Sequence, residues 1–309
     1  MVQKKKILIT GAGGYVGATI AEALKDDYEV VGFGHNAEIN ADITDYKKLS
    51  RAAKGAYAII HTASPTKESW CNEHPYEALR TIVHGTRYVR RVAEENKVPL
   101  VIHFSTQAVY SNFAKRPMPL REDMELKPDT FYGALKALAE GEFYGSRAVI
   151  LRPANIYGIG ASVLRRNVVH VFAENAGKSA PLTVVNGGAQ KADFVHVQDI
   201  ARLVKIIITK HITQSTKQKI KNGGRVVAIN IGSGRATSIR DIARLVVAET
   251  KRLKKKPPEI ISQPAPAGTI AADRWLSIAK ARKRYGWKPG ITLEQGVKEL
   301  LGRFSNLKS

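Results

Sequence analysis

The chain has 309 residues, of which 44% are hydrophobic and 25% are charged, a composition typical of a globular protein that can bury a sizeable core. Its one cysteine, Cys71, excludes an intramolecular disulfide, and no apolar run approaches the roughly 20 residues that a membrane span needs. The N-terminal residues also lack the apolar stretch of a signal peptide. We therefore expect a cytoplasmic location and no association with a membrane.

The balance of charge is strongly basic, with 49 Lys and Arg against 27 Asp and Glu and a formal net charge of +22. Such a field attracts anionic small molecules and nucleic acids. The basic residues are spread along the chain, with the densest run at 251–256, and no RNA-binding motif with interleaved aromatic residues accompanies them. An anionic small-molecule substrate is therefore favoured, and RNA binding remains an alternative.

Residues 10–17, Thr-Gly-Ala-Gly-Gly-Tyr-Val-Gly, stand between an apolar run at 6–9 and a segment with apolar residues at helical spacing at 18–25. This order predicts a buried parallel strand, a glycine turn and a helix. Gly11 permits a tight turn, Gly14 lets the backbone approach a pyrophosphate, and Gly17 allows the helix to pack closely on the strand. Because a helix N-terminus attracts anions, the segment predicts a site for a cofactor diphosphate.

The next two predicted strands, at 28–33 and 57–61, each end in polar residues. After the first comes Gly34-His35-Asn36, at the place where an NAD enzyme usually carries an acid for the ribose 2′-hydroxyl. Neither this acid nor an arginine for a 2′-phosphate is present, so NAD and NADP both remain open. The loop at 64–75, which follows the second strand, is predicted to form a wall of the substrate site.

A predicted helix at 78–92 leads to a buried strand at 100–104, which ends in Ser105 and Thr106. A loop containing prolines at 117–128 precedes a helix at 131–140 that carries Tyr132 and Lys136. Residues four apart lie on one face of a helix. A strand at 148–151 and the loop at 152–158 complete this half of the chain.

The ordered motifs resemble those of the extended short-chain dehydrogenases/reductases of the NAD-dependent epimerase/dehydratase family. The resemblance rests on residues 10–17, 42–43, 61–63, 105–110, 132–136, 151–158, 193–199, 230–234 and 285–289. It implies an α/β fold with a Rossmann-type doubly wound parallel sheet and a smaller α/β substrate-binding lobe. Residues 1–158, completed by about 193–231, would form the dinucleotide-binding domain, and residues 159–192 and 232–309 the lobe.

Within the lobe, we expect a strand at 182–185, an amphipathic helix at 239–253 and a linker-like segment at 257–266 that crosses the mouth of the substrate site.

The resemblance also implies catalytic roles. Tyr132 would exchange a proton with the substrate hydroxyl, Lys136 would bind the nicotinamide ribose, and Thr106 would bond to the reacting oxygen, with Ser105 beside it. A free phenol loses its proton at about pH 10, so such a tyrosine needs a nearby positive charge. The histidines of the predicted strands lack metal-ligand spacing, so we expect structural roles for them and no metal.

The remaining site residues are carried over by position from the same resemblance. We expect cofactor contacts from Gly11, Gly14, Tyr15, Val16, Gly17, Asp42, Ile43, Ala63, Lys136 and Pro153, and substrate contacts from Ser64, Asn155, Lys191 and Arg274. Relatives that bind a nucleotide-sugar diphosphate often carry an arginine at the position of Ala192. Here Lys191 lies one residue earlier, and a lysine binds phosphate only as a point charge.

These features predict an enzyme that uses NAD or NADP, with NAD favoured, to epimerise a nucleotide sugar or to carry out a related sugar conversion. One alternative is an NAD(P)H-dependent reductase or dehydrogenase of a deoxysugar or another carbonyl substrate. The other is an RNA-binding protein built on the same scaffold. By resemblance we also expect a homodimer that pairs through the helices at 78–92 and 132–144.

Overall fold

The computed structural model describes residues 3–110, 116–161, 167–217, 226–265 and 272–306. Six parallel strands form its central sheet in the order β2-β1-β3-β4-β5-β10. They are β1 (Lys6–Thr10), β2 (Glu29–Phe33), β3 (Ala56–His61), β4 (Leu100–Phe104), β5 (Ala148–Pro153) and β10 (Val227–Ile231). Short apolar runs form such strands because a parallel sheet is covered on both faces. The predicted doubly wound sheet is confirmed.

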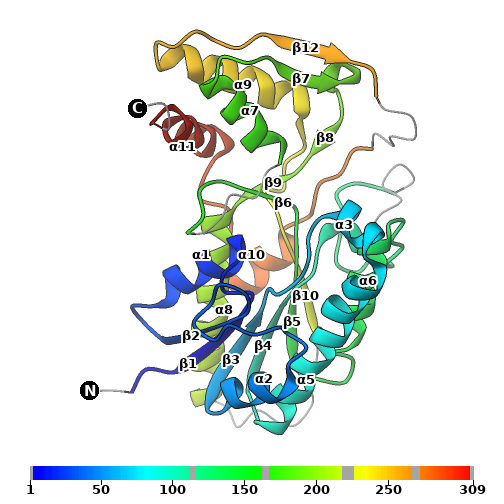
Figure 1. Ribbon diagram of the computed structural model, residues 1–309, viewed down its shortest axis with the longest axis vertical. Helices are drawn as coiled ribbons and strands as arrows, with labels where there is room; N and C mark the ends of the chain where they lie inside the picture. Colours follow the sequence, from blue (N-terminus) through cyan, green and yellow to red (C-terminus); the bar gives the residue numbers. More distant parts are fainter. Residues whose placement is uncertain (1–2, 111–115, 162–166, 218–225, 266–271, 307–309) are drawn as a thin grey trace.

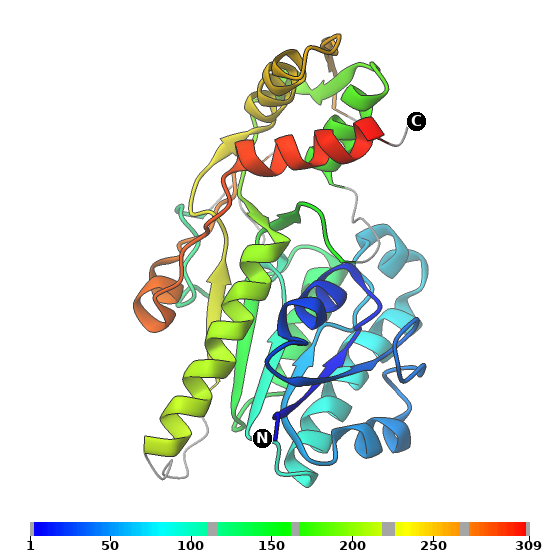
Figure 2. The same ribbon diagram turned by 90° about the vertical axis from the view of Figure 1, so that its left-hand side faces the viewer.

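Helices cover both faces of the sheet (Figures 1 and 2). One face packs against α1 (Tyr15–Leu24) and α8 (Val197–Lys217), and the other against α2 (Tyr46–Ala53), α5 (Gly85–Glu95) and α6 (Phe131–Gly141). No helix within the described ranges is both long enough and apolar enough to cross a membrane. The strand order reverses between β1 and β3, and ligands of such sheets bind at the carboxyl ends of the strands at this switch point.

The segment predicted as one helix at 78–92 is interrupted. It consists of α4 (Pro75–Leu79), a π-helical turn (Arg80–His84) and α5. At the end of this turn the Thr86 hydroxyl donates to the carbonyl of Ile82 at 2.6 Å, and a Cβ added to Gly85 would lie 2.8 Å from the side chain of Ile43. The prediction of a continuous helix was wrong because the extra residue of a π turn leaves the apolar spacing on both sides helical.

A smaller lobe lies above the sheet in Figure 1. Its core is formed by α7 (Val168–Gly177), β7 (Leu182–Val185), α9 (Ile239–Arg252) and α11 (Leu293–Asn306). The segment at 257–266 was expected to be linker-like, but its residues Ile260–Gln263 form β12, which pairs in parallel with β7. This strand belongs to the outer part of the lobe, so the expected crossing of the substrate mouth is wrong for its residues.

One part of the C-terminal segment packs on the sheet and not on the lobe. Helix α10 (Ala279–Tyr285) contributes the buried Ala281 to the core beneath α8, and Trp287 joins the same core with 0% exposure. The Trp287 indole also donates to the carbonyl of Asp199 at 3.0 Å. The expectation that all of 232–309 lies in the lobe therefore differs from the observed packing of this helix.

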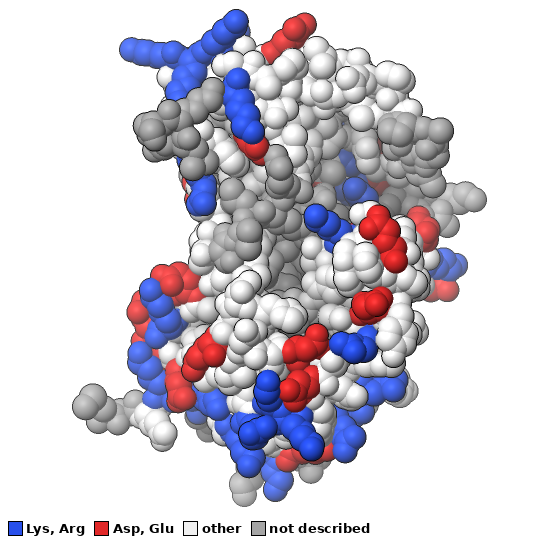
Figure 3. Space-filling view, in the orientation of Figure 1, with Lys and Arg blue, Asp and Glu red and all other residues white. Residues whose placement is uncertain are grey.

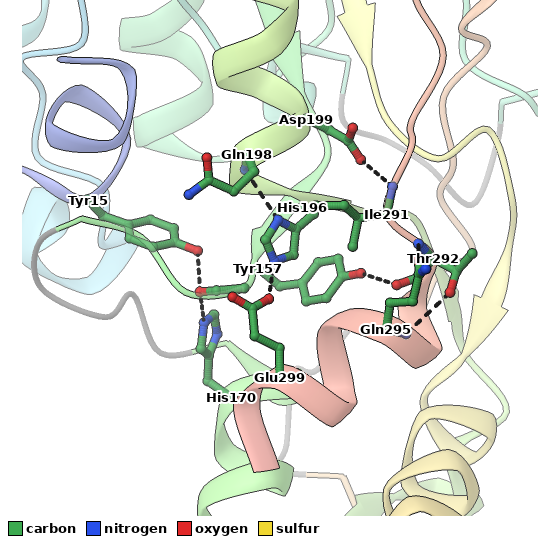
Figure 4. Close-up of polar contacts among 11 residues, drawn as sticks. Tyr15, Tyr157, His170, His196, Gln198, Asp199, Ile291, Thr292, Gln295 and Glu299 are labelled. Carbon is green, nitrogen blue, oxygen red and sulfur yellow. Dashed lines mark hydrogen bonds and ion pairs between the residues drawn. The ribbon is translucent and has the colours of Figure 1, made fainter. Parts of the chain in front are cut away.

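Two buried aspartates hold together the segments that pass between the sheet and the lobe. Asp193 accepts hydrogen bonds from the backbone of Ser233, Gly234 and Leu276. Asp199 accepts from the backbone of Gly290 at 2.8 Å and from that of Ile291 at 3.0 Å, the second of which Figure 4 shows. Burial raises the pKa of Asp193, because the bonds from Ser233 only partly offset the loss of water.

The same junction contains His196, the last residue of β9 (Phe194–His196), which lies opposite Tyr157 of the parallel strand β6 (Asn155–Tyr157). Its Nδ1 accepts from the backbone of Gln198, so the neutral ring carries its proton on Nε2 and donates to Glu299 of α11 at 2.9 Å (Figure 4). The hydroxyl of Tyr157 donates to the carbonyl of Thr292. His196 is thus a structural link between the sheet and the lobe, as expected.

A charged network lies inside the sheet layer, directly behind the ends of β4 and β5. Arg152 forms a two-pronged ion pair with Glu140, with Nε to Oε1 at 2.9 Å and Nη2 to Oε2 at 2.6 Å. Both residues are at most 8% exposed. The Arg152 guanidinium also donates to the hydroxyl of Tyr110, which donates to Asn230 of β10. Burial disfavours the charge of Arg152, but the bonds to Glu140 outweigh it and raise the Arg152 pKa.

This network fixes the position of α6 relative to the neighbouring strands. Glu140 lies one turn after Lys136 on α6, and its Oε1 also accepts the hydroxyl of Ser105 at 2.5 Å. Lys136 Nζ donates to the carbonyl of Phe104 at 2.7 Å. Helix α6 is therefore attached to β4 at two points and to β5 at one.

We expect Glu140→Gln to lower the free energy of unfolding by about 3–5 kcal/mol, because the Arg152 guanidinium would stay buried without its counter-charge. Urea unfolding measures this change. The matched control is Glu142→Gln, which removes an ion pair with Arg87 at a site where the arginine side chain is 53% exposed, and we expect at most about 1 kcal/mol there. Equal small losses in both variants would contradict a stabilising role for the network.

Two histidines are buried side by side on β3 and β4, with ring centroids 5.2 Å apart. The Thr86 hydroxyl already donates to a carbonyl, so it accepts from His61 Nε2 at 3.0 Å, which leaves His61 Nδ1 to accept from Thr10. His103 has no hydrogen-bond partner on either ring nitrogen among the described residues. Burial, aided by the charge of Lys136, lowers the pKa of His61 to about 3 and holds that of His103 well below its usual value.

The folded protein therefore binds fewer protons than the unfolded chain between about pH 3 and 6.5. Stability is fully present above pH 6.5 and is lost as the pH falls through this window. We expect His103→Phe to lose less unfolding free energy than the native protein between pH 7 and pH 4.5, because the variant lacks one buried ring that gains a proton on unfolding. Urea unfolding at both values tests this, with the exposed His35→Gln as the control. A full pH dependence in His103→Phe would show that the loss has another origin.

Candidate active site

A cavity lies at the carboxyl ends of β3, β4 and β5, at the edge of the sheet that faces the lobe. The structure brings together around it residues that the sequence places far apart, and those among them that the sequence analysis selected are Val16, Ser64, Ser105, Thr106, Tyr132, Lys136, Pro153 and Asn155. They come from α1, α6, and the segments after three neighbouring strands. The position agrees with the place where open parallel sheets bind their ligands.

Tyr132 and Lys136 lie one turn apart on α6, and both line the cavity. Helix α6 begins cleanly because the side chain of Thr130 accepts from the backbone of Gly133 and caps its first turn. Lys136 is 3% exposed. Burial lowers its pKa to about 8, while the nearby Glu140 opposes this shift. At neutral pH the ammonium therefore stays mostly protonated, and it can supply positive charge to a neighbouring phenolate.

The two hydroxyl residues after β4 are held differently. Thr106 caps the short 3-10 helix Gln107–Val109 by accepting from the backbone of Ala108 at 3.2 Å, so its hydroxyl proton is available to a ligand oxygen. The Ser105 hydroxyl donates to Glu140 behind the cavity. Its proton is thus used in the buried network, which suits a positioning role better than direct contact with a reacting oxygen.

The glycine turn between β1 and α1 has the shape of a phosphate cradle. Gly11 has φ +74, and a Cβ there would lie 2.7 Å from the backbone nitrogen of Ala63. A Cβ on Gly17 would lie 2.2 Å from the carbonyl of Gly11, whereas one on Gly14 would approach only that carbonyl, at 3.2 Å. The turn therefore presses against β3 on one side and leaves space above Gly14, the N-cap of α1. The chain thus fits a dinucleotide whose diphosphate occupies this space.

The other cofactor residues lie at the rim of this turn. The side chain of Tyr15 is turned toward the segment after β6, because its hydroxyl donates to the carbonyl of Gly158 at 2.7 Å (Figure 4). Ile43 is 5% exposed and packs into the core under α5. Asp42 remains partly exposed, and two hydrogen bonds from Thr44 outweigh the effect of its burial and lower its pKa.

Two predicted substrate residues do not line the cavity. Lys191 and Arg274 lie on adjacent segments near the base of the lobe, where the backbone of Arg274 donates to the carbonyl of Lys191 at 3.0 Å. The Lys191 side chain is exposed, while the guanidinium of Arg274 is largely buried, which lowers its pKa despite the charges of Glu68 and Asp129. The structure therefore brings the backbones of this pair together outside the lining of the cavity, and the Arg274 guanidinium interacts with the charge of Asp129, three residues before Tyr132.

Two further residues lie at this edge of the sheet that the sequence motifs do not single out. The guanidinium of Arg80, from the π-helical turn, lies 3.9 Å from the carboxylate of Asp42. A cation is therefore present near the segment that follows β2, although no arginine comes directly after that strand. Gln107 lines the cavity directly after Thr106. The position of Arg80 depends on the π turn, which the sequence pattern does not reveal, and Gln107 could have been noted because it follows a strand of the sheet.

Basic side chains do not form a continuous face in the view of Figure 3, where blue and red atoms alternate over the lower part of the molecule. Ion pairs such as Arg90 with Glu94 and Arg91 with Glu95 on α5 place opposite charges side by side on the surface. A hollow separates the lobe from the sheet on the right of the same view. Residues 217–225 also carry several lysines and an arginine, and residues 218–225 lie outside the described ranges.

Comparison with known proteins gives consistent matches over most of the chain. A putative UDP-glucose 4-epimerase of Methanocaldococcus jannaschii is 25% identical, over 97% of this chain and 98% of that protein. The dTDP-4-dehydro-6-deoxyglucose reductase of Escherichia coli is 22% identical, over 97% of each chain. The structure of UDP-glucose-4-epimerase from Stenotrophomonas maltophila, with bound NAD and formylated UDP-arabinopyranose, has a TM-score of 0.85 at 18% identity and covers 98% of this chain and 99% of that one.

The model of one protein family matches residues 7–231, which include the glycine turn, the cavity and the whole central sheet. This match, over well more than half of the sequence, agrees with the fold and with the order of the motifs. The chain belongs to the NAD dependent epimerase/dehydratase family.

Proposed function

We propose that this protein is a nucleotide-sugar epimerase that retains NAD through its catalytic cycle. The observation that carries the proposal is the cavity at which Thr106, Tyr132 and Lys136 meet beside the glycine turn. In this proposal, residues 1–158 with about 193–231 bind the dinucleotide and residues 159–192 with 232–309 bind the substrate, except that α10 serves the sheet. The similarity to UDP-glucose 4-epimerases supports a UDP-sugar as the substrate.

In the proposed reaction, nicotinamide, when bound, supplies a reversible acceptor for hydride from the sugar carbon. Tyr132 takes the proton of the hydroxyl on that carbon and later returns it, while Thr106 donates a hydrogen bond to the same oxygen. Lys136 stabilises the phenolate by its charge, and the Phe104 carbonyl fixes its ammonium. The sugar turns over between the two proton transfers, which inverts the carbon.

The composition of the cavity favours epimerisation or reduction over dehydration. Loss of water from a sugar needs one group to protonate the departing hydroxyl and another to remove a proton from the neighbouring carbon. Among the described residues that line the cavity, none is an aspartate or a glutamate. The nearest carboxylate of the network, Glu140, is fully engaged by Arg152 and Ser105.

The second candidate is a reductase that releases its cofactor after each reaction. It uses the same Tyr132, Lys136 and Thr106, and the similarity to a deoxysugar reductase supports it. The exposed Lys191 in place of a phosphate-binding arginine fork also favours a substrate that is gripped less tightly at its diphosphate. A role in RNA binding has less support, because basic and acidic groups are interspersed in the face shown in Figure 3.

The test of the function is to denature the purified protein and to identify and count the nucleotide that it releases. An epimerase of this type should release nearly one NAD per chain, since the hydride returns to the sugar in each cycle, and the native protein should convert UDP-glucose. An empty protein that then binds NADH or NADPH would favour the reductase. A protein that binds no nicotinamide cofactor would contradict both.

In the same assay, we expect Tyr132→Phe to lower turnover by at least about 10²-fold, because the proton-transfer group is removed. The content of nicotinamide nucleotide should stay nearly unchanged, since the phenol acts on the substrate. Tyr144→Phe is the matched control, because Tyr144 is 94% exposed beyond the end of α6. Full activity of Tyr132→Phe would rule out the mechanism.

We propose further that two copies pair through α4, α5 and α6. Large apolar side chains are exposed on these helices or next to them: Tyr76 is 69% exposed, Phe131 39%, Leu138 57% and Tyr144 94%. Helix α6 packs beside the π-helical turn and α4, so these side chains lie on one side of the sheet layer. Apolar groups gathered on one surface are typical of a contact with another protein chain.

Leu138→Glu should convert the dimer into a monomer, because it places a charge within the proposed contact. Light scattering during size-exclusion chromatography measures the mass. Leu253→Glu is the control, since Leu253 is an exposed leucine beyond the end of α9, far from this surface. A native protein that is already monomeric, or an unchanged dimer in Leu138→Glu, would contradict the proposed contact.

A further inference from the structure

Gln107 is a buried polar residue of the cavity whose side-chain acceptor has no partner in the part of the chain that the structure describes. It follows Thr106 and begins the 3-10 helix after β4, and it is only 6% exposed. Its backbone carbonyl accepts from Tyr110. Its side-chain oxygen Oε1, however, has no hydrogen-bond partner among the described residues, although it lies in the lining of the active-site cavity.

An unsatisfied buried acceptor destabilises the fold, and folded proteins rarely keep one without a reason. Asn167 differs, because its Oδ1 accepts from the backbone of Val169 at 3.1 Å. Asn155, which is only partly buried, donates through Nδ2 to the carbonyl of Asp193 at 2.9 Å. Among the described residues of the lining, Gln107 is therefore the buried amide whose acceptor remains available for a ligand.

The surroundings define the chemistry of that ligand. Hydroxyl and amide side chains dominate the polar part of the lining, and Lys136 is the one charged residue among the described lining residues. Its ammonium is held by the carbonyl of Phe104. A cavity of this composition suits an uncharged ring with several hydroxyls, because each hydroxyl can donate and accept hydrogen bonds without bringing a charge that lacks a partner.

The place of Gln107 in the sheet separates it from the cofactor turn. Gln107 follows β4 and the glycine turn follows β1, and β3 lies between these two strands. Gln107 is instead next to Thr106, on the side of the cavity that α6 closes with Tyr132. A group that meets Oε1 therefore belongs to the part of the ligand that reaches the reacting oxygen.

We propose that Gln107 determines substrate specificity, with Oε1 accepting a hydrogen bond from a hydroxyl of the neutral sugar ring of the substrate. This inference rests on the proposed function and adds to it the class of sugar and the residue that recognises it. The same arrangement explains why an enzyme keeps an unsatisfied buried amide, since the missing bond forms only when the substrate is present. A site that hydrogen-bonds one hydroxyl discriminates strongly against an analogue that lacks it.

The test compares UDP-glucose with its 2-deoxy, 3-deoxy and 6-deoxy analogues in the native protein and in Gln107→Leu. In the native protein, one analogue should lose about 10- to 100-fold in kcat/KM relative to UDP-glucose. In Gln107→Leu, UDP-glucose should fall to the level of that analogue, and the difference between the two should disappear. Gln198→Leu, at an exposed glutamine outside the cavity, should keep the native pattern.

The free energy of unfolding is a second measurement. Replacing a merely structural residue would lower it, whereas the proposal predicts no loss in Gln107→Leu. Without substrate, Gln107→Leu should be at least as stable to urea as the native protein, because it removes a buried acceptor without a partner. Its content of nicotinamide nucleotide should stay native. If Gln107→Leu fails to fold, Gln107→Met, which also lacks the acceptor, takes its place with the same expectations, and failure of both variants to fold overturns the proposal.

Several results would contradict the inference alone: an unchanged kcat/KM for UDP-glucose in Gln107→Leu, an equal penalty for every deoxy analogue in both proteins, or a loss of nicotinamide nucleotide from the variant. The last result would assign Gln107 to the cofactor. Failure of the proposed function gives a different result, since the native protein would then neither convert nor bind UDP-glucose. In that case the inference fails together with the function.

Discussion

The ion pair between Glu140 and Arg152 is the interaction on which the active site depends. Helix α6 carries Tyr132, Lys136 and Glu140 at intervals of four residues, so all three point to the same side. Because Glu140 is locked to β5 by two hydrogen bonds and to β4 through Ser105, the rotation of the helix about its axis is fixed. The orientation of Tyr132 and Lys136 toward the cavity follows from that lock.

The free-energy cost of burying these charges is offset because the polar atoms of the network have hydrogen-bond partners. A buried charge is tolerated only where it is paired and its remaining donors are satisfied, and the Arg152 guanidinium meets this condition through Glu140 and Tyr110. The contrast with Gln107 is informative. One layer behind the cavity the polar atoms are satisfied by the protein itself, whereas at the cavity wall one acceptor is left for a ligand.

Buried polar residues also have structural roles where the chain passes between the sheet and the lobe. Asp193 and Asp199 bind backbone amides from segments that are far apart in sequence, and His196 links β9 to α11. These residues belong to a motif that matches the family, yet their contacts are structural. They hold the lobe over the carboxyl ends of the strands, where Asn155 and Thr106 line the cavity.

The sequence by itself determined the features that are encoded locally. The strand, glycine turn and helix at the N-terminus, the parallel sheet, and the pairing of Tyr132 with Lys136 on one helix all follow from short-range spacing, and the sheet and its family are confirmed. Only the tertiary structure decided the π turn that brings Arg80 to Asp42, the packing of α10 on the sheet, the burial of the Arg274 guanidinium and, among the described residues, the unpaired Oε1 of Gln107. The physical reason is that each of these depends on contacts between residues distant in the chain, and on which polar atoms those contacts satisfy, neither of which a linear pattern records.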